Sequence, residues 1–181
     1  MLINWPNRIS LLRIILVPVF IIAIINELIY LPIFIFAVCM FSDALDGFLA
    51  RRFNQKTRIG TFLDPAGDKL LLISAYITLA VVQKIPWWVT IIVLSRDLFI
   101  VTGWLLIYFI TDSSTVTPRI LSKITTFFQM VTVLLVLFSR YSIVNGILIY
   151  LYYFTVFITI LSGLDYLYTS FSNFKKEGMI C

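Results

Sequence analysis

Acidic residues gather in the stretch Ser42–Leu70, and their spacing places them in two pairs. Asp43 and Asp46 are three residues apart and Asp64 and Asp68 are four apart, so each pair would share one face of a helix. A basic, polar segment, RRFNQKTRIG, separates the pairs and is typical of a turn. We therefore expect a helical hairpin that gathers four carboxylates into one site.

The two pairs also match in depth. Asp43 lies eight residues before Arg51, and Asp68 lies eight residues after Gly60, so each would sit ~12 Å from the turn at helical rise. Apolar runs long enough to span a bilayer flank the stretch on both sides. The carboxylates would therefore lie at membrane depth.

Four clustered carboxylates need compensation, because each charge in lipid costs roughly 3 kcal/mol even on the lenient insertion scale. One possibility is pairing with the neighbouring basic residues, which also suit a turn that faces water and anionic head groups. The other is a divalent metal, because hard cations prefer oxygen ligands and Mg²⁺ is commonly shared between carboxylates and substrate phosphates. We favour the metal. The basic residues concerned are Arg51, Arg52, Lys56, Arg58 and Lys69.

The complete spacing is D-x2-D-G-x2-A-R-x8-G-x3-D-x3-D. It resembles the signature of the CDP-alcohol phosphatidyltransferases, with every signature position filled. The resemblance implies an integral membrane enzyme that transfers a phosphatidyl group from CDP-diacylglycerol to an alcohol and releases CMP. It also suggests a homodimer. The matching positions are Asp43, Asp46, Gly47, Ala50, Arg51, Gly60, Asp64 and Asp68.

The resemblance also implies roles for these residues. Asp43, Asp46, Asp64 and Asp68 would bind Mg²⁺ or Mn²⁺, with two ions ~4 Å apart gripping the diphosphate. Asp68 would in addition be the general base that deprotonates the acceptor hydroxyl. The CDP site would be lined by Gly47, Ala50, Arg51 and Gly60. The chain has no histidine, which excludes a histidine base or a phosphohistidine intermediate.

Composition indicates the architecture. Hydrophobic residues make up 61% of the chain and charged residues 13%, which excludes a soluble globular domain. The 181 residues suffice for about six spans of ~20 residues. We expect an all-α bundle of six transmembrane helices in a single domain, 1–181. The expected spans begin near residues 9, 28, 61, 85, 118 and 143, and the second and third form the carboxylate hairpin.

The distribution of positive residues predicts orientation. With six spans both termini share a side, and that side collects nearly all of the basic residues placed near the ends of spans, leaving only Lys84 and Arg140 opposite. The termini and the active site should therefore face the cytoplasm. The net charge of +5 suits anionic membrane lipid, and no nucleic-acid module is apparent.

Basic residues outside the hairpin are candidates for binding the acceptor. Arg96-Asp97 interrupts the fourth span and is either a functional site or a mutually neutralised pair. Arg119 and Lys123 are one helical turn apart and would form a basic approach to an anionic substrate. We take Arg96, Arg119 and Lys123 as candidates for the acceptor phosphate. Arg13, in the first span, either reaches toward head groups or faces substrate.

Two segments bear on which acceptor is used. The opening NWPNRISLLR is similar to the start of phosphatidylglycerophosphate and cardiolipin synthases. The run SKITTFFQM resembles a segment of phosphatidylglycerophosphate synthases, although Ser122 and Thr125 replace a glycine and a lysine. Glycerol 3-phosphate is therefore the favoured acceptor.

Alternatives stay open. Ser95-Arg96-Asp97 looks more like the cardiolipin synthase branch, in which phosphatidylglycerol is the acceptor, and a serine or inositol-phosphate acceptor is less favoured. A cation transporter could also place carboxylates in a bundle. It would need neither the small residues nor the basic turn beside them.

The paired carboxylates predict two different phenotypes. Asp43→Asn or Asp64→Asn should abolish CMP release in a protein that still folds, because a metal ligand is lost. Asp68→Asn should keep near-normal CDP-diacylglycerol affinity but lower the single-turnover rate at least ~100-fold, the lower end for loss of a general base. Titration with CDP-diacylglycerol in the presence of Mg²⁺ measures the affinity, and single-turnover CMP formation measures the rate. Full activity of either Asp43→Asn or Asp64→Asn, or full activity in excess EDTA, would contradict the metal hypothesis.

Overall fold

The structure, a computed structural model, describes residues 5–53, 58–111, 120–139 and 145–176. Side chains are described for 13–42, 67, 69–103, 120–139 and 146–169. These ranges contain helices and no strand, which confirms the predicted all-α class. The helices are α1 (Trp5–Ile25), α2 (Tyr30–Phe53), α3 (Arg58–Val81), α4 (Trp87–Thr111), α5 (Ile120–Phe138) and α6 (Asn145–Lys176).

The connection between α2 and α3 is shorter than predicted. Because α2 continues to Phe53 and α3 begins at Arg58, Arg51 and Gly60 are helical, and the prediction that RRFNQKTRIG as a whole forms a turn was wrong at both ends. Residues 54–57 lie outside the described ranges. Arginine is a good helix former, and its long side chain can reach water from the last turn of a helix, so a basic segment need not end one.

α1 and α3 end in the same type of hydrogen-bonded cap. At the end of α1, Glu27 N–H donates to Ile24 O (3.0 Å) and Leu28 N–H donates to Ala23 O (3.0 Å). Glu27 has φ 57°, the left-handed conformation that this Schellman arrangement requires. After α3, Gln83 has the same φ, and Lys84 N–H donates to Leu79 O at 2.8 Å. These caps satisfy carbonyl groups that would otherwise lack partners.

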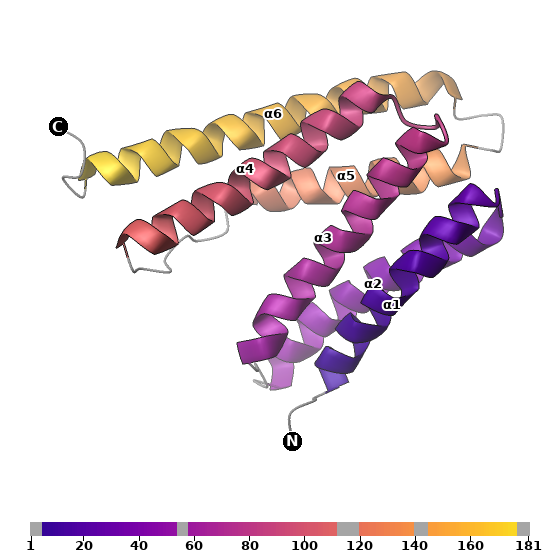
Figure 1. Cartoon of the computed structure of the whole chain (residues 1–181), viewed down its shortest axis with the longest axis horizontal. Helices are drawn as coiled ribbons and strands as arrows, with labels where there is room; N and C mark the ends of the chain where they lie inside the picture. The colour runs from indigo at the N-terminus through magenta and orange to yellow at the C-terminus, as the bar shows by residue number, and fades with distance from the viewer. Residues whose placement is uncertain (1–4, 54–57, 112–119, 140–144, 177–181) are drawn as a thin grey trace. The chain divides into compact units, whose positions relative to one another are not determined.

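Contacts among the helices divide the chain into two compact units. The first unit contains α1, α2, α3 and the end of α5 from Val133. Here α1 packs against both α2 and α3 (Figure 1), and Phe20 of α1 stacks on Phe36 of α2 with ring centroids 5.9 Å apart. On α3 the buried side chains recur at the spacing of one helix face. They include Leu72, Ala75, Tyr76 and Leu79.

The second unit contains α4, α6 and α5 as far as Thr132. α4 and α6 run side by side (Figure 1), and Trp88 of α4 meets Tyr153 of α6 with ring centroids 5.4 Å apart. Near Gly103 of α4 the ring of Tyr166 comes so close that a Cβ added to the glycine would lie 2.8 Å from it. Small residues at such crossings let apolar helices approach closely.

A polar seam joins α5 to α6 inside this second unit. Gln129 Nε2 donates to Thr159 Oγ1 at 3.2 Å, and the hydroxyls of Thr132 and Thr155 are 2.7 Å apart. All four side chains are fully buried. Because lipid gives apolar helices little hydrophobic reason to associate, hydrogen bonds of this kind help to hold one helix against another.

Two helical stretches within the described residues are long and apolar enough to cross a membrane, Ile120–Phe138 and Gly146–Thr169. Three shorter apolar stretches, Arg13–Ile25, Tyr30–Ser42 and Lys69–Val81, belong to α1, α2 and α3. These lengths are consistent with a membrane bundle.

Three glycines of the second unit should differ in how well the protein tolerates their replacement by alanine. Gly103→Ala should lower stability by about 1–3 kcal/mol, the usual cost of overpacking, because the Tyr166 ring blocks the added Cβ. Gly163→Ala should be tolerated, since its Cβ would make only a 3.8 Å contact with Arg96 Cγ. Gly146→Ala, with nothing within 4 Å, is the matched control. Thermal unfolding in detergent measures all three, and equal midpoints would contradict the close α4–α6 packing.

Candidate functional site

The predicted carboxylate site falls on α2 and α3. Asp43 and Asp46 lie in the C-terminal half of α2, and Asp64 and Asp68 lie in the N-terminal half of α3. Their side chains are outside the described set, as are those of Ala50 and Arg51, so the metal and CDP roles stay predictions. The same applies to Gly47 on α2 and Gly60 on α3. Within the described side chains, no group of three or more potential metal ligands occurs.

The helices that carry these aspartates are held by α1. Both α2 and α3 pack on α1, and Gly67, next to Asp68, is buried. Arg13 of α1 is only 2% exposed. A side chain reaching for head groups would be exposed, so the snorkelling interpretation of Arg13 was wrong: its guanidinium belongs to the interior of the first unit. A basic group therefore lies buried in the same unit as the predicted carboxylate hairpin.

Arg96 of α4 is the most heavily bonded of the predicted site residues that are described. Its guanidinium is 4% exposed and forms an ion pair with Asp97, with Nη1 2.7 Å from Oδ1. Nη2 donates to Ser122 Oγ of α5 at 2.8 Å and to Ser162 Oγ of α6 at 2.7 Å. One side chain thus connects three helices. The mutual neutralisation of Arg96 and Asp97 that the sequence allowed is present.

Not every donor of this guanidinium is used. Arg96 Nε is buried and has no hydrogen-bond partner among the described residues. A buried donor without an acceptor costs roughly 1–3 kcal/mol, and more when the group is charged. An oxygen acceptor from outside the described side chains would remove this cost.

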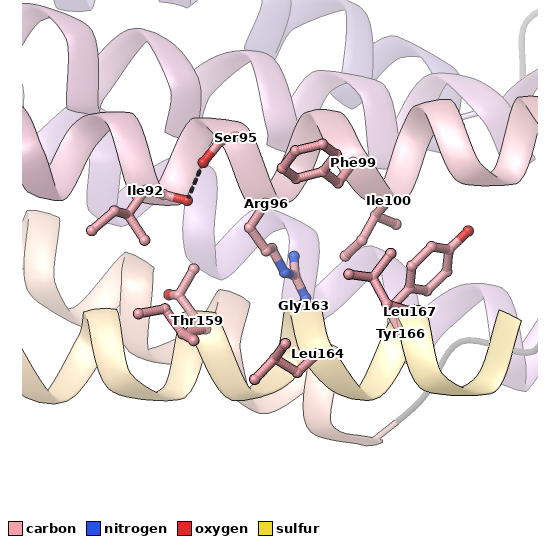
Figure 2. Close-up of a pocket in the computed structure, with 11 residues that line it drawn as sticks. Ile92, Ser95, Arg96, Phe99, Ile100, Thr159, Gly163, Leu164, Tyr166 and Leu167 are labelled. Atoms are coloured by element: carbon pink, nitrogen blue, oxygen red, sulfur yellow. Dashed lines mark hydrogen bonds between the residues drawn. The ribbon is translucent and has the colours of Figure 1, made fainter. Parts of the chain in front are cut away.

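A cavity of about 190 Å³ adjoins Arg96 between α4 and α6. In Figure 2 the Arg96 side chain extends from α4 toward α6 and Gly163, with Phe99 and Ile100 following it along α4. The rest of the lining comes mostly from apolar side chains, so Arg96 is its one charged residue among those described. The other lining residues are Ile92, Ser95, Thr159, Ile160, Leu164, Tyr166 and Leu167.

The other two predicted acceptor-binding cations differ from Arg96. Lys123 follows Ser122 on α5 and is exposed. Arg119 lies outside the described residues. Ser122 accepts a hydrogen bond from Arg96. Lys123 is the next residue of α5, so it adjoins the Arg96 network in sequence while its own side chain is exposed.

The chain matches the family model for CDP-alcohol phosphatidyltransferase over residues 3–161. The chain belongs to the CDP-alcohol phosphatidyltransferase family. This confirms the family inferred from the carboxylate spacing. The eight signature positions, on α2 and α3, all fall inside the matched region.

Curated relatives agree with this assignment. The chain is 39% identical over 101 residues to a probable phosphatidylglycerophosphate synthase of Mycobacterium tuberculosis, covering 52% of this chain and 48% of that protein, so this match spans about half of the relative's length. It is 31% identical over 193 residues to the CDP-diacylglycerol--glycerol-3-phosphate 3-phosphatidyltransferase of Bacillus subtilis, covering 97% and 99%. Human cardiolipin synthase (CMP-forming) is 35% identical over 119 residues, covering 65% and 38%.

Sequence reasoning missed the partners of Arg96 in this family member. Ser122 was noted only as a replacement for glycine, and Ser162 was not considered. A pattern could have revealed them, because polar residues recur on one face of each of two apolar helices. These residues are Ser122, Thr125, Gln129 and Thr132 on α5, and Thr155, Thr159 and Ser162 on α6.

The Arg96–Asp97 pair predicts non-additive mutations. Arg96→Met leaves a buried carboxylate and Asp97→Leu leaves a buried guanidinium, and removing one partner of a buried pair costs about 3–5 kcal/mol. The double variant should be clearly more stable than the sum of the two losses predicts. Unfolding midpoints in detergent give the coupling. Additive losses would contradict the pairing.

A kinetic readout separates stability from substrate binding. If Arg96 also binds acceptor, the double variant should regain stability yet keep a raised KM for acceptor. A double variant with normal acceptor KM would assign Arg96 to structure alone.

Proposed function

We propose that this chain transfers a phosphatidyl group from CDP-diacylglycerol to glycerol 3-phosphate, releasing CMP, as a step of membrane phospholipid synthesis. The observation that carries the proposal is the full eight-position signature, whose members lie on the consecutive helices α2 and α3. Similarity to the named transferase of Bacillus subtilis over 97% of the chain supports the choice of acceptor.

The donor set fits a divalent metal. Four aspartates on two helices joined by a short connection offer only hard oxygen ligands, which suit Mg²⁺ or Mn²⁺. Asp43, Asp46, Asp64 and Asp68 would hold the metal. When bound, it would supply charge neutralisation of the diphosphate and of the departing CMP.

The remaining chemistry belongs to the chain's own residues. Asp68 would take the proton of the acceptor hydroxyl as that oxygen forms its bond to the β-phosphorus, and the bond from this phosphorus to the CMP oxygen would break. Phosphoryl transfer depends mainly on positioning and charge stabilisation, so no covalent enzyme intermediate is needed. Gly47, Ala50 and Gly60 would leave space for the nucleotide, beside the charge of Arg51.

We infer that Lys123, rather than Arg96, is the main residue that binds the acceptor phosphate. Its side chain is exposed on α5, whereas Arg96 already bonds to Asp97 and two serines. Arg119, one turn before Lys123 in sequence, would complete a basic approach. A lysine ammonium binds phosphate as a compact point charge and needs no fixed fork geometry.

The same proposal places the enzyme in the membrane as a six-span protein. The two apolar stretches Ile120–Phe138 and Gly146–Thr169 support spanning, and the excess of basic residues near the expected hairpin and termini supports a cytoplasmic active site. Both substrates would be reached from that side. A homodimer, suggested by the family resemblance, is part of the proposal.

Phosphatidylglycerol is the second candidate acceptor, which would make the product cardiolipin. The observation in its favour is the segment Ser95-Arg96-Asp97, of which Ser95 and Arg96 line the apolar cavity on α4. Similarity to human cardiolipin synthase covers 65% of this chain.

An acceptor panel tests the function. Purified protein in proteoliposomes with CDP-diacylglycerol and Mg²⁺ should release CMP with glycerol 3-phosphate and form phosphatidylglycerophosphate, identified by mass. Lys123→Gln should raise the KM for glycerol 3-phosphate by about tenfold, equivalent to one charge-assisted contact of ~1.4 kcal/mol, with little change in donor affinity. Ile124→Gln, at the next exposed position of α5, is the matched control.

Other products would change the conclusion in defined ways. Cardiolipin formed from phosphatidylglycerol, with no use of glycerol 3-phosphate, would select the second candidate. Cation flux without any CMP release would overturn the transferase and support a transporter.

A further inference from the structure

The cavity between α4 and α6 has the lining of a hydrocarbon site. Apart from Arg96 and the hydroxyl-bearing residues, its walls are isoleucine, leucine and phenylalanine side chains and Gly163. A wholly polar molecule such as glycerol 3-phosphate would leave most of its hydrogen-bonding groups unsatisfied there. The cavity therefore suits an apolar occupant.

Several side chains that line this cavity are exposed on the outer surface of the helices. Phe99, Leu164 and Ile160 line it and are exposed. Two of them belong to Gly146–Thr169, which is long and apolar enough to cross a membrane. In a bilayer these side chains would face lipid, and lipid chains would be the molecules at hand to fill the space.

A pure hydrocarbon does not account for Arg96. Its Nε is buried without an acceptor among the described residues, whereas Nη1 reaches Asp97 and Nη2 reaches Ser122 and Ser162. The ion pair with Asp97 already balances the charge of the guanidinium. Among the described residues, Nε lacks a neutral oxygen acceptor, and the same side chain lines an apolar space. An ester carbonyl at the head of an acyl chain has that chemistry.

We propose that the α4–α6 cavity binds one ester-linked acyl chain of a membrane phospholipid, with the ester carbonyl accepting a hydrogen bond from Arg96 Nε. This inference rests on the membrane embedding proposed above and is independent of which acceptor the enzyme uses. Because the guanidinium is neutralised by Asp97, the site recognises the chain and its ester and is indifferent to the head group.

The experiment uses the full chain in proteoliposomes with a phosphatidylcholine that carries a diazirine in its acyl chain. After illumination, mass spectrometry should find label concentrated on the cavity residues Ile160, Leu164 and Leu167. It should find less on Phe157, which is at least as exposed on α6 as these residues but does not line the cavity.

Filling the cavity provides the matched variants. Ile160→Trp should bring the labelling of Leu164 and Leu167 down to the level of Phe157, because the indole would occupy the space. Leu161→Trp is the control, since Leu161 is 41% exposed against 47% for Ile160 but is not a lining residue. Leu164→Trp is a second filling variant, read out at Leu167, should Ile160→Trp fold poorly. CMP release with each acceptor is measured on the same samples, so loss of catalysis is distinguished from loss of the lipid site.

Competition tests the indifference to head group. Unlabelled phosphatidylcholine and phosphatidylglycerol should reduce cavity labelling equally, and glycerol 3-phosphate should not reduce it. Even labelling along α6, or labelling unchanged by both filling variants, would overturn the acyl-chain site. Strong selective competition by phosphatidylglycerol would overturn the claim of head-group indifference and identify the cavity as an acceptor site.

Discussion

The hydrogen bonds of Arg96 are the interaction on which the second unit most depends. Helices that are apolar on nearly every face gain little by hiding from lipid, so their mutual arrangement must come from close packing and a few polar contacts. Arg96 ties α4 to Ser122 of α5 and Ser162 of α6, and Asp97 makes its charge tolerable. The polar seam Gln129–Thr159 and Thr132–Thr155 continues the same line of contact between α5 and α6. Bulky apolar residues alone would permit several rotations of these helices about their axes.

Helices could be predicted from the sequence because the evidence for them is local. Apolar runs located the six helices that the structure describes, and spacing of three and four residues placed each aspartate pair on one face. The ends were harder. Glu27 and Gln83 adopt a left-handed conformation that usually indicates glycine, so neither cap was foreseeable from residue type. Arg51 and Gly60 remain in helices because residues compatible with a turn are also compatible with a helix.

In the candidate site, too, the features set by local sequence were predictable and those that depend on distant residues were not. The carboxylate positions are a short-range pattern, and their family assignment is confirmed by the match over residues 3–161. The Arg96 network is a long-range property, since Ser162 lies 66 residues further along the chain. No spacing within α4 tells which serine of another helix will face it. The α4–α6 cavity was unpredictable for that reason, because it exists only where the lining residues of two distant helices come together.

Arg96 and Lys123 show why burial decides what a basic residue can do for an anionic substrate. A phosphate binding to Arg96 would have to replace bonds to an aspartate and two hydroxyls that already satisfy most of its donors, and it would place a second negative charge beside Asp97. Lys123 has neither obstacle, because it is exposed and carries three donors on a flexible stem. The two cations are adjacent to the same residue, because Ser122 accepts a hydrogen bond from Arg96 and Lys123 directly follows it on α5. The buried Arg96 would then fix the arrangement of the helices, and the exposed Lys123 would bind the substrate. Whether a positive charge serves structure or binding depends on how many of its hydrogen-bond donors are already bonded within the protein.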